Sequence, residues 1–238
     1  MSAVVRRGHA PNDHREFFGE AAEVLFRAGR DLHYLLNQGY AIKGASTFVS
    51  NHYLLSERQR LALARAISSD ASIGARREKE ITDITAGCVV NIDGFNTIIT
   101  LEVALSGSVL LRCMDGTVRD LAELRGTYRL IDKTDAAIML IGKALESSGV
   151  SKAVFYLDAP VSNVWRLKQR IIDLWKPLNI EVQVEVTDGV DRILEKLGNV
   201  ITGDAIILDN CISWINLNRR IIEGFDEGYP FVDFLREL

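Results

Sequence analysis

Residues 89–96 of this 238-residue chain read Val-Val-Asn-Ile-Asp-Gly-Phe-Asn, and this stretch decides the fold class. Its apolar run predicts a short strand buried on both faces, as in sheets that are covered by helices on both sides. The strand ends at Asp93, and Gly94 follows directly. Because open α/β sheets bind their ligands at the carboxyl ends of their strands, Asp93 is a candidate site residue.

The same pattern of an apolar strand followed by an acid returns twice. Asp158 follows Ala-Val-Phe-Tyr-Leu, and Asp204 follows Val-Ile-Thr-Gly. Helix signals alternate with the strands, so residues 86–238 predict an α/β domain with a mainly parallel, doubly wound sheet. Within it, residues 204–208 are expected to continue the last strand or to form a second short one, and residues 213–223 to form a helix.

Residues 1–85 have a different pattern and predict a small, all-helical domain. Apolar residues spaced three and four apart predict one helix over residues 13–39. Ser56 with Gln59 three residues later has the form of a capping box, which predicts the start of another helix. No glycine-rich or serine-rich linker follows, so we expect this domain to dock against the α/β domain.

Charge and composition also divide the chain. Residues 1–86 contain twelve Lys and Arg against ten Asp and Glu, a net charge of +2, and the remainder contains sixteen against twenty-two, a net charge of −6. The three cysteines lie far apart in apolar surroundings, which favours buried thiols in a reducing compartment. No apolar run approaches the ~20 residues that span a bilayer. We expect a cytoplasmic protein without membrane contact, and a homo-oligomer remains open.

The acids after the strands point to a metal site. The carboxyl ends of parallel strands meet at one edge of the sheet, so Asp93, Asp158 and Asp204 could converge there. Asp188 and Asp191, at the start of a helix after another strand, are candidates for a fourth ligand. Carboxylates in one cleft repel each other, and Mg²⁺ or Mn²⁺ would stabilise them. Such an ion activates water and polarises phosphoryl oxygens, so all these acids except Asp191 are also candidate catalytic residues.

A simpler interpretation competes with the metal site. Aspartate is common after strands because it caps the next helix, and for any single one of these acids capping is favoured. Four acids in this order shift the balance toward a metal. Asp115 is interpreted as a turn residue only. Glu102, Asp120 and Asp135 are expected to support the acids from behind.

The order of these motifs resembles the PIN/NYN nuclease-like superfamily over residues 87–210. The resemblance implies a PIN-like fold, a Mg²⁺ or Mn²⁺ site and phosphodiester hydrolysis, usually of RNA. It assigns metal binding to Asp93, Asp158 and Asp204, with Asp188 or Asp191 as the fourth acid. By position it also matches Asn96 to the polar residue after the first strand and Thr202 to the hydroxyl before the last acid, so both are expected to support the acids from behind. The whole chain also resembles an uncharacterised two-part family in which a helical domain of unknown function precedes a PIN-like domain. The residues behind that second resemblance are Leu-Leu-Asn-Gln-Gly-Tyr at 35–40 and Asp-Gly-Phe-Asn at 93–96.

The helical part contains the densest run of cations in the chain. Cations beside an acidic metal cleft would suit a nuclease, because they hold the phosphate backbone while the acids hold the metal. A solvated helix face, with nearby glutamates compensating the charge, explains the run equally well. The candidate RNA-binding residues are Arg58, Arg60, Arg65, Arg76, Arg77 and Lys79.

Three functions therefore remain open. The first is a metal-dependent endoribonuclease, the second is a non-catalytic RNA-binding or assembly module on the same fold, and the third is a small-molecule phosphohydrolase. All four histidines lie in residues 1–86, so catalytic histidines in the α/β part are not expected. No Walker A motif, dinucleotide-binding glycine motif or Ser-His-Asp set is present.

Overall fold

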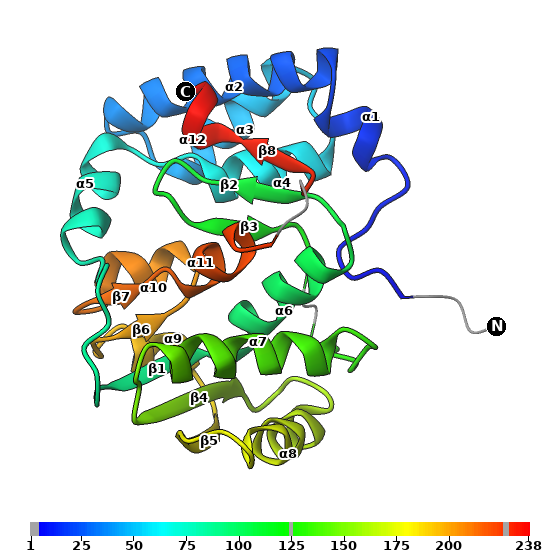
Figure 1. Ribbon diagram of the computed structural model, residues 1–238. Coiled ribbons are helices and arrows are strands. Elements are labelled where there is room, and N and C mark those ends of the chain that lie inside the picture. Colours follow the sequence, from blue (N-terminus) through cyan, green and yellow to red (C-terminus); the bar gives the residue numbers. More distant parts are fainter. Residues whose placement is uncertain (1–4, 124–125, 226–228) are drawn as a thin grey trace.

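The computed structural model describes residues 5–123, 126–225 and 229–238. Three tiers are stacked in Figure 1: a layer of helices at the top, a small sheet beneath it, and an α/β layer at the bottom. The N-terminal third of the chain forms the helical layer, and both the middle and the end of the chain contribute to the small sheet.

The α/β layer is built on a five-stranded, entirely parallel sheet, in agreement with the predicted mainly parallel sheet. Its strand order is β5-β4-β1-β6-β7. The β5 strand lies at one edge, as its alternating polar and apolar residues predict. The strands are β1 (Val89–Asp93), β4 (Lys152–Asp158), β5 (Glu181–Thr187), β6 (Val200–Ile201) and β7 (Trp214–Ile215).

The strand order changes direction at β1. From β1 the chain proceeds to β4 and β5 on one side, and then returns to β6 and β7 on the other. At such a switch point the connections after neighbouring strands diverge, which leaves a crevice at the carboxyl ends. Asp93 ends β1, Asp158 ends β4, and Asp204 lies three residues beyond the end of β6. The topology thus brings the three predicted acids to one crevice.

Helices cover both faces of this sheet, and adjacent strand residues show it. Val200 and Trp214 belong to one apolar cluster with α9 and α10, whereas Ile201 and Ile215 belong to a larger one with the helices on the opposite face. The sheet is therefore doubly covered. The larger cluster takes in α6 (Gly94–Leu105), α7 (Thr134–Ser147), α8 (Val164–Trp175) and α11 (Leu217–Glu223), and the smaller one α9 (Val190–Leu194) and α10 (Ala205–Asn210).

The helical layer confirms the capping box and corrects one helix. Ser56 and Gln59 form reciprocal capping hydrogen bonds at the start of α4. The single helix predicted over 13–39 is wrong, because the chain breaks at Gly19, whose φ of +63° lies in the left-handed region. The layer contains α1 (Asp13–Phe17), α2 (Glu20–Asn37), α3 (Ile42–His52), α4 (Glu57–Ala66) and α5 (Asp70–Glu78).

The small sheet shares its core with the helical layer. Leu111 and Phe234 lie in one apolar cluster with Leu25, Leu32 and Leu63 of the helices. The helices therefore complete their core with segments from the middle and the end of the chain. This sheet contains β2 (Leu110–Arg112), β3 (Val118–Asp120) and β8 (Phe231–Asp233), and α12 (Phe234–Glu237) follows β8.

Two local predictions near the crevice are wrong. Residues 205–210 form the helix α10 and no strand, because Asp204 caps its first turn. Residues 214–215, predicted as the start of a helix, form strand β7, which extends the sheet. None of the helices in the described part of the chain has the length and apolar character needed to cross a membrane.

Candidate functional site

A pocket of about 760 Å³ lies where the helical layer faces the carboxyl edge of the parallel sheet. Asp93, Asp158 and Asp204 line it from the sheet side. Residues of the α2–α3 turn, α4 and α5 line it from the helical side, and β3 contributes Arg119 and Asp120. The crevice predicted by the sheet topology is thus roofed by the helical layer.

Asp93 is the most perturbed acid of the pocket. Its residue is 7% exposed, and burial, opposed by a hydrogen bond from Thr202 and reinforced by the nearby Asp204 and Asp191, raises its pKa to about 7. Asp93 stands directly before α6, and the backbone N–H of Asn96 in that helix lowers its pKa, although the contact lacks the geometry of a full capping hydrogen bond. No described cation forms an ion pair with Asp93. Capping alone therefore does not explain a buried Asp93 without a cationic partner.

Thr202 links Asp93 to Asp204. Its hydroxyl donates to Asp93 Oδ2 at 2.8 Å and accepts from the backbone N–H of Asp204 at 3.0 Å. Asp204 Oδ1 accepts the N–H groups of Ile206 and Ile207, so Asp204 does cap α10. Both capping bonds end on Oδ1, and none of the described residues donates a hydrogen bond to Oδ2. One oxygen of Asp204 is therefore available to a ligand.

The remaining acids divide into one inside the pocket and two beside it. Asp158 lines the pocket, and partial burial together with nearby Asp188 raises its pKa. Asp188 and Asp191 are exposed and do not line the pocket. Partial burial of the Asp191 carboxyl, then nearby Asp204 and Asp158, raise the pKa of Asp191, so its charge acts on the same site.

The acids are near one another without forming a closed metal cage. Within residues 5–123, 126–225 and 229–238, no three His, Cys, Asp or Glu side chains are grouped tightly enough to bind one ion. Zinc-type sites need such a preformed set of ligands. Mg²⁺ differs, because it keeps several waters and binds through one or two carboxylates plus substrate phosphates. The donor set here is all oxygen and partly open, which fits Mg²⁺ or Mn²⁺ and does not fit zinc.

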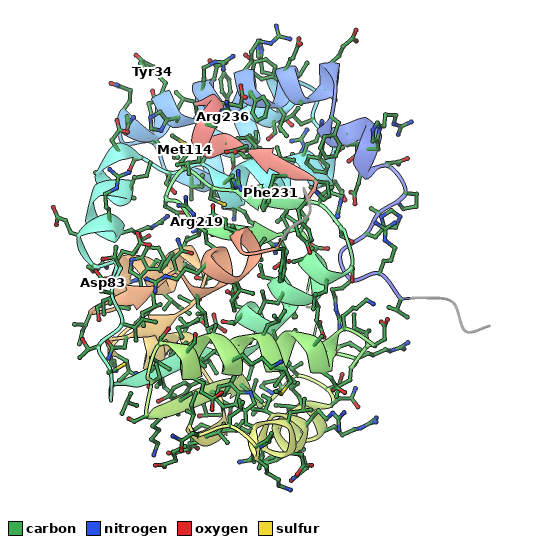
Figure 2. The ribbon with its side chains drawn as sticks, viewed as in Figure 1. Tyr34, Asp83, Met114, Arg219, Phe231 and Arg236 are labelled. Carbon is green, nitrogen blue, oxygen red and sulfur yellow. The ribbon has the colours of Figure 1, made fainter. Side chains whose placement is uncertain are left out.

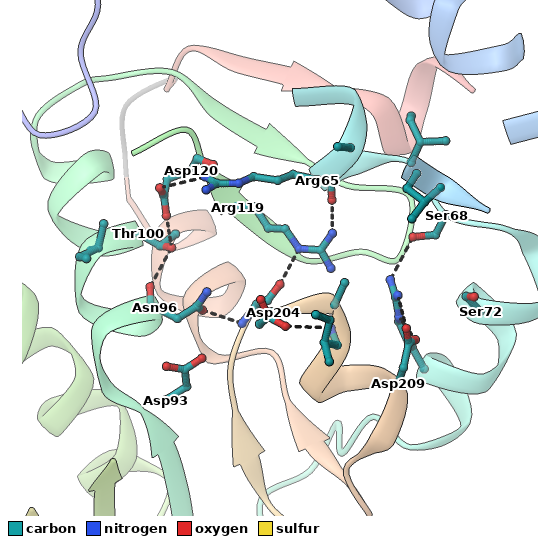
Figure 3. Close-up of a pocket in the computed structure, with 18 of the residues that line it drawn as sticks. Arg65, Ser68, Ser72, Asp93, Asn96, Thr100, Arg119, Asp120, Asp204 and Asp209 are labelled. Atoms are coloured by element: carbon teal, nitrogen blue, oxygen red, sulfur yellow. Dashed lines mark hydrogen bonds and ion pairs between the residues drawn. The ribbon is translucent and has the colours of Figure 1, made fainter. Parts of the chain in front are cut away.

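Three of the polar residues expected behind the acids lie at the pocket. Thr202 holds Asp93, as described above. The side-chain oxygen of Asn96 accepts the N–H of Gly203 at 2.7 Å, so it ties α6 to the loop before Asp204. Asp120 accepts a hydrogen bond from Thr100 at 2.6 Å, on the side of Asn96 that faces away from Asp93 (Figure 3).

The other two lie elsewhere, which corrects their predicted place. Glu102 is fully buried away from the pocket, where Tyr128 donates to it at 2.8 Å and Arg7 forms an ion pair with it at 2.8 Å. Its pKa is raised by burial, which these partners offset only in part. Asp135 lies at the surface in an ion pair with Arg170. Glu102 lies on α6 and Asp135 on α7, and these helices turn both side chains toward partners outside the pocket.

Sequence reasoning missed a buried ion network beside the pocket. Asp115 was interpreted as a turn residue, yet its carboxylate has no exposed surface and pairs with Arg76 at 2.6 Å and Arg119 at 2.5 Å. Burial alone would raise the pKa of Asp115, but Arg119, Thr117 and Arg76 together lower it. Arg119 also donates to the carbonyl of Gly203, next to Asp204, and to that of Arg65 in α4 (Figure 3). Arg119 thus joins the acidic loop to the helical layer.

Most of the predicted RNA-binding cations have intramolecular partners. Arg58 pairs with Asp13, and Arg60 donates to Asn51. Arg76 is buried between Asp115 and Asp209. The partners of these three cations are thus aspartates and an asparagine and not the nearby glutamates that the sequence suggested, and Arg76 does not belong to a solvated face. Arg65 donates to the carbonyls of Asp120 and Ala122, Lys79 donates to those of Leu208 and Asp209, and Arg77 is exposed.

Comparisons with known proteins divide the chain at a similar place. The family model described as "Domain of unknown function (DUF5616)" matches residues 82–220, and the one described as "Protein of unknown function (DUF434)" matches residues 24–79. The chain is 36% identical over 184 residues to "Uncharacterized protein MJ0935" of Methanocaldococcus jannaschii. The matched segment covers 76% of this chain and 88% of that relative. No solved structure matches the chain. The two-part, uncharacterised family inferred from the sequence is confirmed.

Proposed function

We propose that this chain, which belongs to the DUF5616 family of unknown function, is a divalent-metal-dependent enzyme that hydrolyses phosphodiesters, with RNA as the expected substrate. The observation that carries the proposal is the set of three acids in the switch-point pocket, with Asp93 buried beside Thr202 and two other acids. The resemblance to the PIN/NYN superfamily supports a PIN-like fold and RNA as the substrate.

The state of Asp93 supports a cation at this site. A buried carboxylate with a pKa of about 7 is only partly ionised at neutral pH. An ion that binds there must displace the proton, and its charge then offsets both the burial and the repulsion from Asp204 and Asp191. Asp93 and the unbonded oxygen of Asp204 would hold the ion. When bound, a divalent ion supplies charge stabilisation at a phosphoryl oxygen and a more acidic water.

The protein's own residues would then orient the metal-binding acids and take a proton from the attacking water. Thr202 holds Asp93 in one orientation, and Asn96 together with Arg119 holds the Gly203 backbone that carries Asp204. Asp158 is half-buried and its pKa is raised, which makes its carboxylate a better proton acceptor for a nearby water. In this proposal Asp188 and Asp191 contribute negative charge at the rim, and neither is a required ligand.

A second candidate is hydrolysis of a small phosphate ester. The observation in its favour is that the helical layer covers the acids and leaves a pocket of about 760 Å³, the size of a small-molecule site. The internal pairing of Arg58, Arg60 and Arg76 also leaves fewer cations for a long RNA backbone. A pocket of this volume is large enough for one nucleotide. The two candidates therefore differ in whether the phosphate that is cleaved belongs to an RNA chain or to a small molecule.

The test is a hydrolysis assay with matched variants. Purified protein with Mn²⁺ or Mg²⁺ is expected to cleave labelled RNA, and EDTA is expected to stop it. Asp93→Asn and Asp204→Asn should each reduce cleavage by at least about 100-fold, since each removes a charge and keeps the shape; asparagine also preserves the cap of α10. Asp135→Asn is the control, because Asp135 pairs with Arg170 outside the pocket.

The outcomes separate the alternatives. Undiminished cleavage in the Asp93→Asn, Asp204→Asn double variant would exclude the proposed site. Turnover of p-nitrophenyl phosphate without RNA cleavage would favour the small-ester candidate. RNA binding without hydrolysis of either substrate would favour a non-catalytic RNA-binding or assembly module.

A further inference from the structure

The stretch 35–40, Leu-Leu-Asn-Gln-Gly-Tyr, shapes one wall of the pocket. It ends α2 with two hydrogen bonds, from Gly39 N–H to Leu36 O at 3.0 Å and from Tyr40 N–H to Leu35 O at 3.1 Å. Gly39 has a φ of +84°, which completes a Schellman motif. In that motif the residue after the glycine commonly packs back onto its own helix. Tyr40 remains 60% exposed in this position and lines the pocket.

Tyr40 belongs to a group of three exposed apolar residues at this pocket. Ile42, at the start of α3, is 41% exposed, and Ile206, on α10 of the α/β layer, is 59% exposed. All three line the same pocket, and they come from both of its sides. We call Tyr40, Ile42 and Ile206 the apolar rim. The described part of the chain leaves these side chains uncovered, so a ligand in the pocket can cover them.

The apolar rim is tied directly to the acids. The N–H of Ile206 donates to Asp204 Oδ1 at 2.8 Å in the N-terminal cap of α10. Ile206 of the rim and Asp204 of the acidic edge are therefore only two residues apart. A ligand that uses both must carry an apolar, stackable group close to a phosphate. A nucleotide has this combination, because the base presents a flat face and the phosphate follows the sugar. Ser69 and Ser72 add hydroxyls to the same wall.

We propose that the apolar rim binds an unpaired nucleobase, so that the substrate of the acidic site is single-stranded RNA and not duplex RNA. The proposal rests on the proposed function and makes it narrower. In a duplex each base is stacked on its neighbours and paired at its edge, so its face cannot reach Tyr40 inside a pocket. A single strand can turn one base into the pocket and place the adjoining phosphate at Asp93 and Asp204.

The test is binding without turnover. A short, fluorescein-labelled single-stranded RNA is titrated with the full chain in Ca²⁺, without Mg²⁺ or Mn²⁺, so that a divalent ion can join the acids to the phosphate, and anisotropy reports the affinity. Tyr40→Ala is expected to weaken binding about tenfold or more, the effect of losing one base–aromatic stack. Tyr40→Phe keeps the ring and should bind like the unmodified protein. Tyr34→Ala is the matched control, because Tyr34 is 63% exposed on α2, which ends just before Tyr40, but lies outside the pocket, at the outer side of the helical layer (Figure 2).

Ile206→Ala gives an independent readout from the other wall and should also weaken binding. Unlabelled single-stranded RNA should displace the probe, whereas the same sequence annealed into a duplex should not. Equal affinity of Tyr40→Ala and Tyr34→Ala, equal competition by the duplex, or no binding of the RNA at all would overturn the proposal. Tyr40-dependent binding of RNA that is never hydrolysed in Mn²⁺ would instead leave the base site intact and refute the proposed enzymatic function.

Discussion

The hydroxyl of Thr202 donates to the carboxylate of Asp93 at 2.8 Å, although 109 positions separate the two residues. The same oxygen accepts the N–H of Asp204 at 3.0 Å. One side chain therefore sets the relative position of the acids that end β1 and follow β6. The first prediction follows from this contact.

Replacing Thr202 with valine keeps the shape of the side chain and removes the hydroxyl. The hydrogen bond lowers the pKa of Asp93, so its loss should raise that pKa further and weaken Mn²⁺ binding at neutral pH. The unpaired carboxylate should also cost about 1–3 kcal/mol of stability above pH 7. Calorimetric Mn²⁺ titration and urea denaturation measure the two effects. Thr202→Ser retains the hydroxyl and should behave like the unmodified protein; a valine variant with normal Mn²⁺ affinity contradicts the assigned role.

The second prediction concerns pH. Folding raises the pKa of Asp93 from 3.8 to about 7, mainly by burial. The folded protein therefore binds a proton that the unfolded chain has released, and the stability associated with protonated Asp93 is full below pH 3.8 and falls as pH rises toward 7. The total loss should be about 4 kcal/mol.

Asp93→Asn resembles the protonated form and should remove this loss. The metal-free variant should be more stable than the metal-free parent at pH 8, and the difference should shrink as pH falls toward 4. Urea unfolding in EDTA across this range provides the measurement. Added Mn²⁺ should stabilise only the parent protein. A variant that is less stable than the parent at pH 8 would show that Asp93 has a stabilising partner.

The third prediction concerns the buried network around Asp115. Asp115→Asn leaves Arg76 and Arg119 without their shared counter-charge in a buried setting, and this should destabilise the protein by about 3–5 kcal/mol. Asp173→Asn removes an exposed acid that pairs with Lys176 and should leave stability nearly unchanged. Urea denaturation midpoints compare the two. Equal midpoints would mean that Asp115 is only a turn residue.

The fourth prediction concerns Gly94, which follows Asp93. A Cβ at Gly94 would lie 2.5 Å from Leu157 Cδ2 and 3.0 Å from the carbonyl oxygen of Tyr156, on the neighbouring strand. Gly94→Ala should therefore push α6 away from β4, cost about 1–3 kcal/mol and lower any activity that depends on Asp93. Gly74→Ala in α5 is the control, because no atom lies within 4 Å of its added Cβ. That substitution should stabilise the protein by about 0.5–1 kcal/mol. Thermal unfolding of both variants tests the contrast.

Local patterns predicted much of the scaffold, because the signals that define it are short in range. Apolar runs predicted β1 and β4, the alternation of polar and apolar residues in β5 agrees with its place at the sheet edge, and the capping box predicted the start of α4. The error at Asp204 had a local cause as well. The apolar residues 205–208 suit a strand or a buried helix turn equally, and only the capping bonds from Asp204 decide for the helix.

The sequence alone determined that the acids meet at one edge of the sheet, because each follows a strand and parallel strands have their carboxyl ends at the same edge. The tertiary structure decided which acids face the pocket. Glu102 and Asp135 have suitable spacing but point to Arg7 and Arg170, since the direction of a helix face depends on what packs against it. The buried Asp115 network and the apolar rim join segments that are distant in sequence. No local pattern encodes such contacts, because they exist only after the helical layer has packed over the carboxyl edge of the sheet.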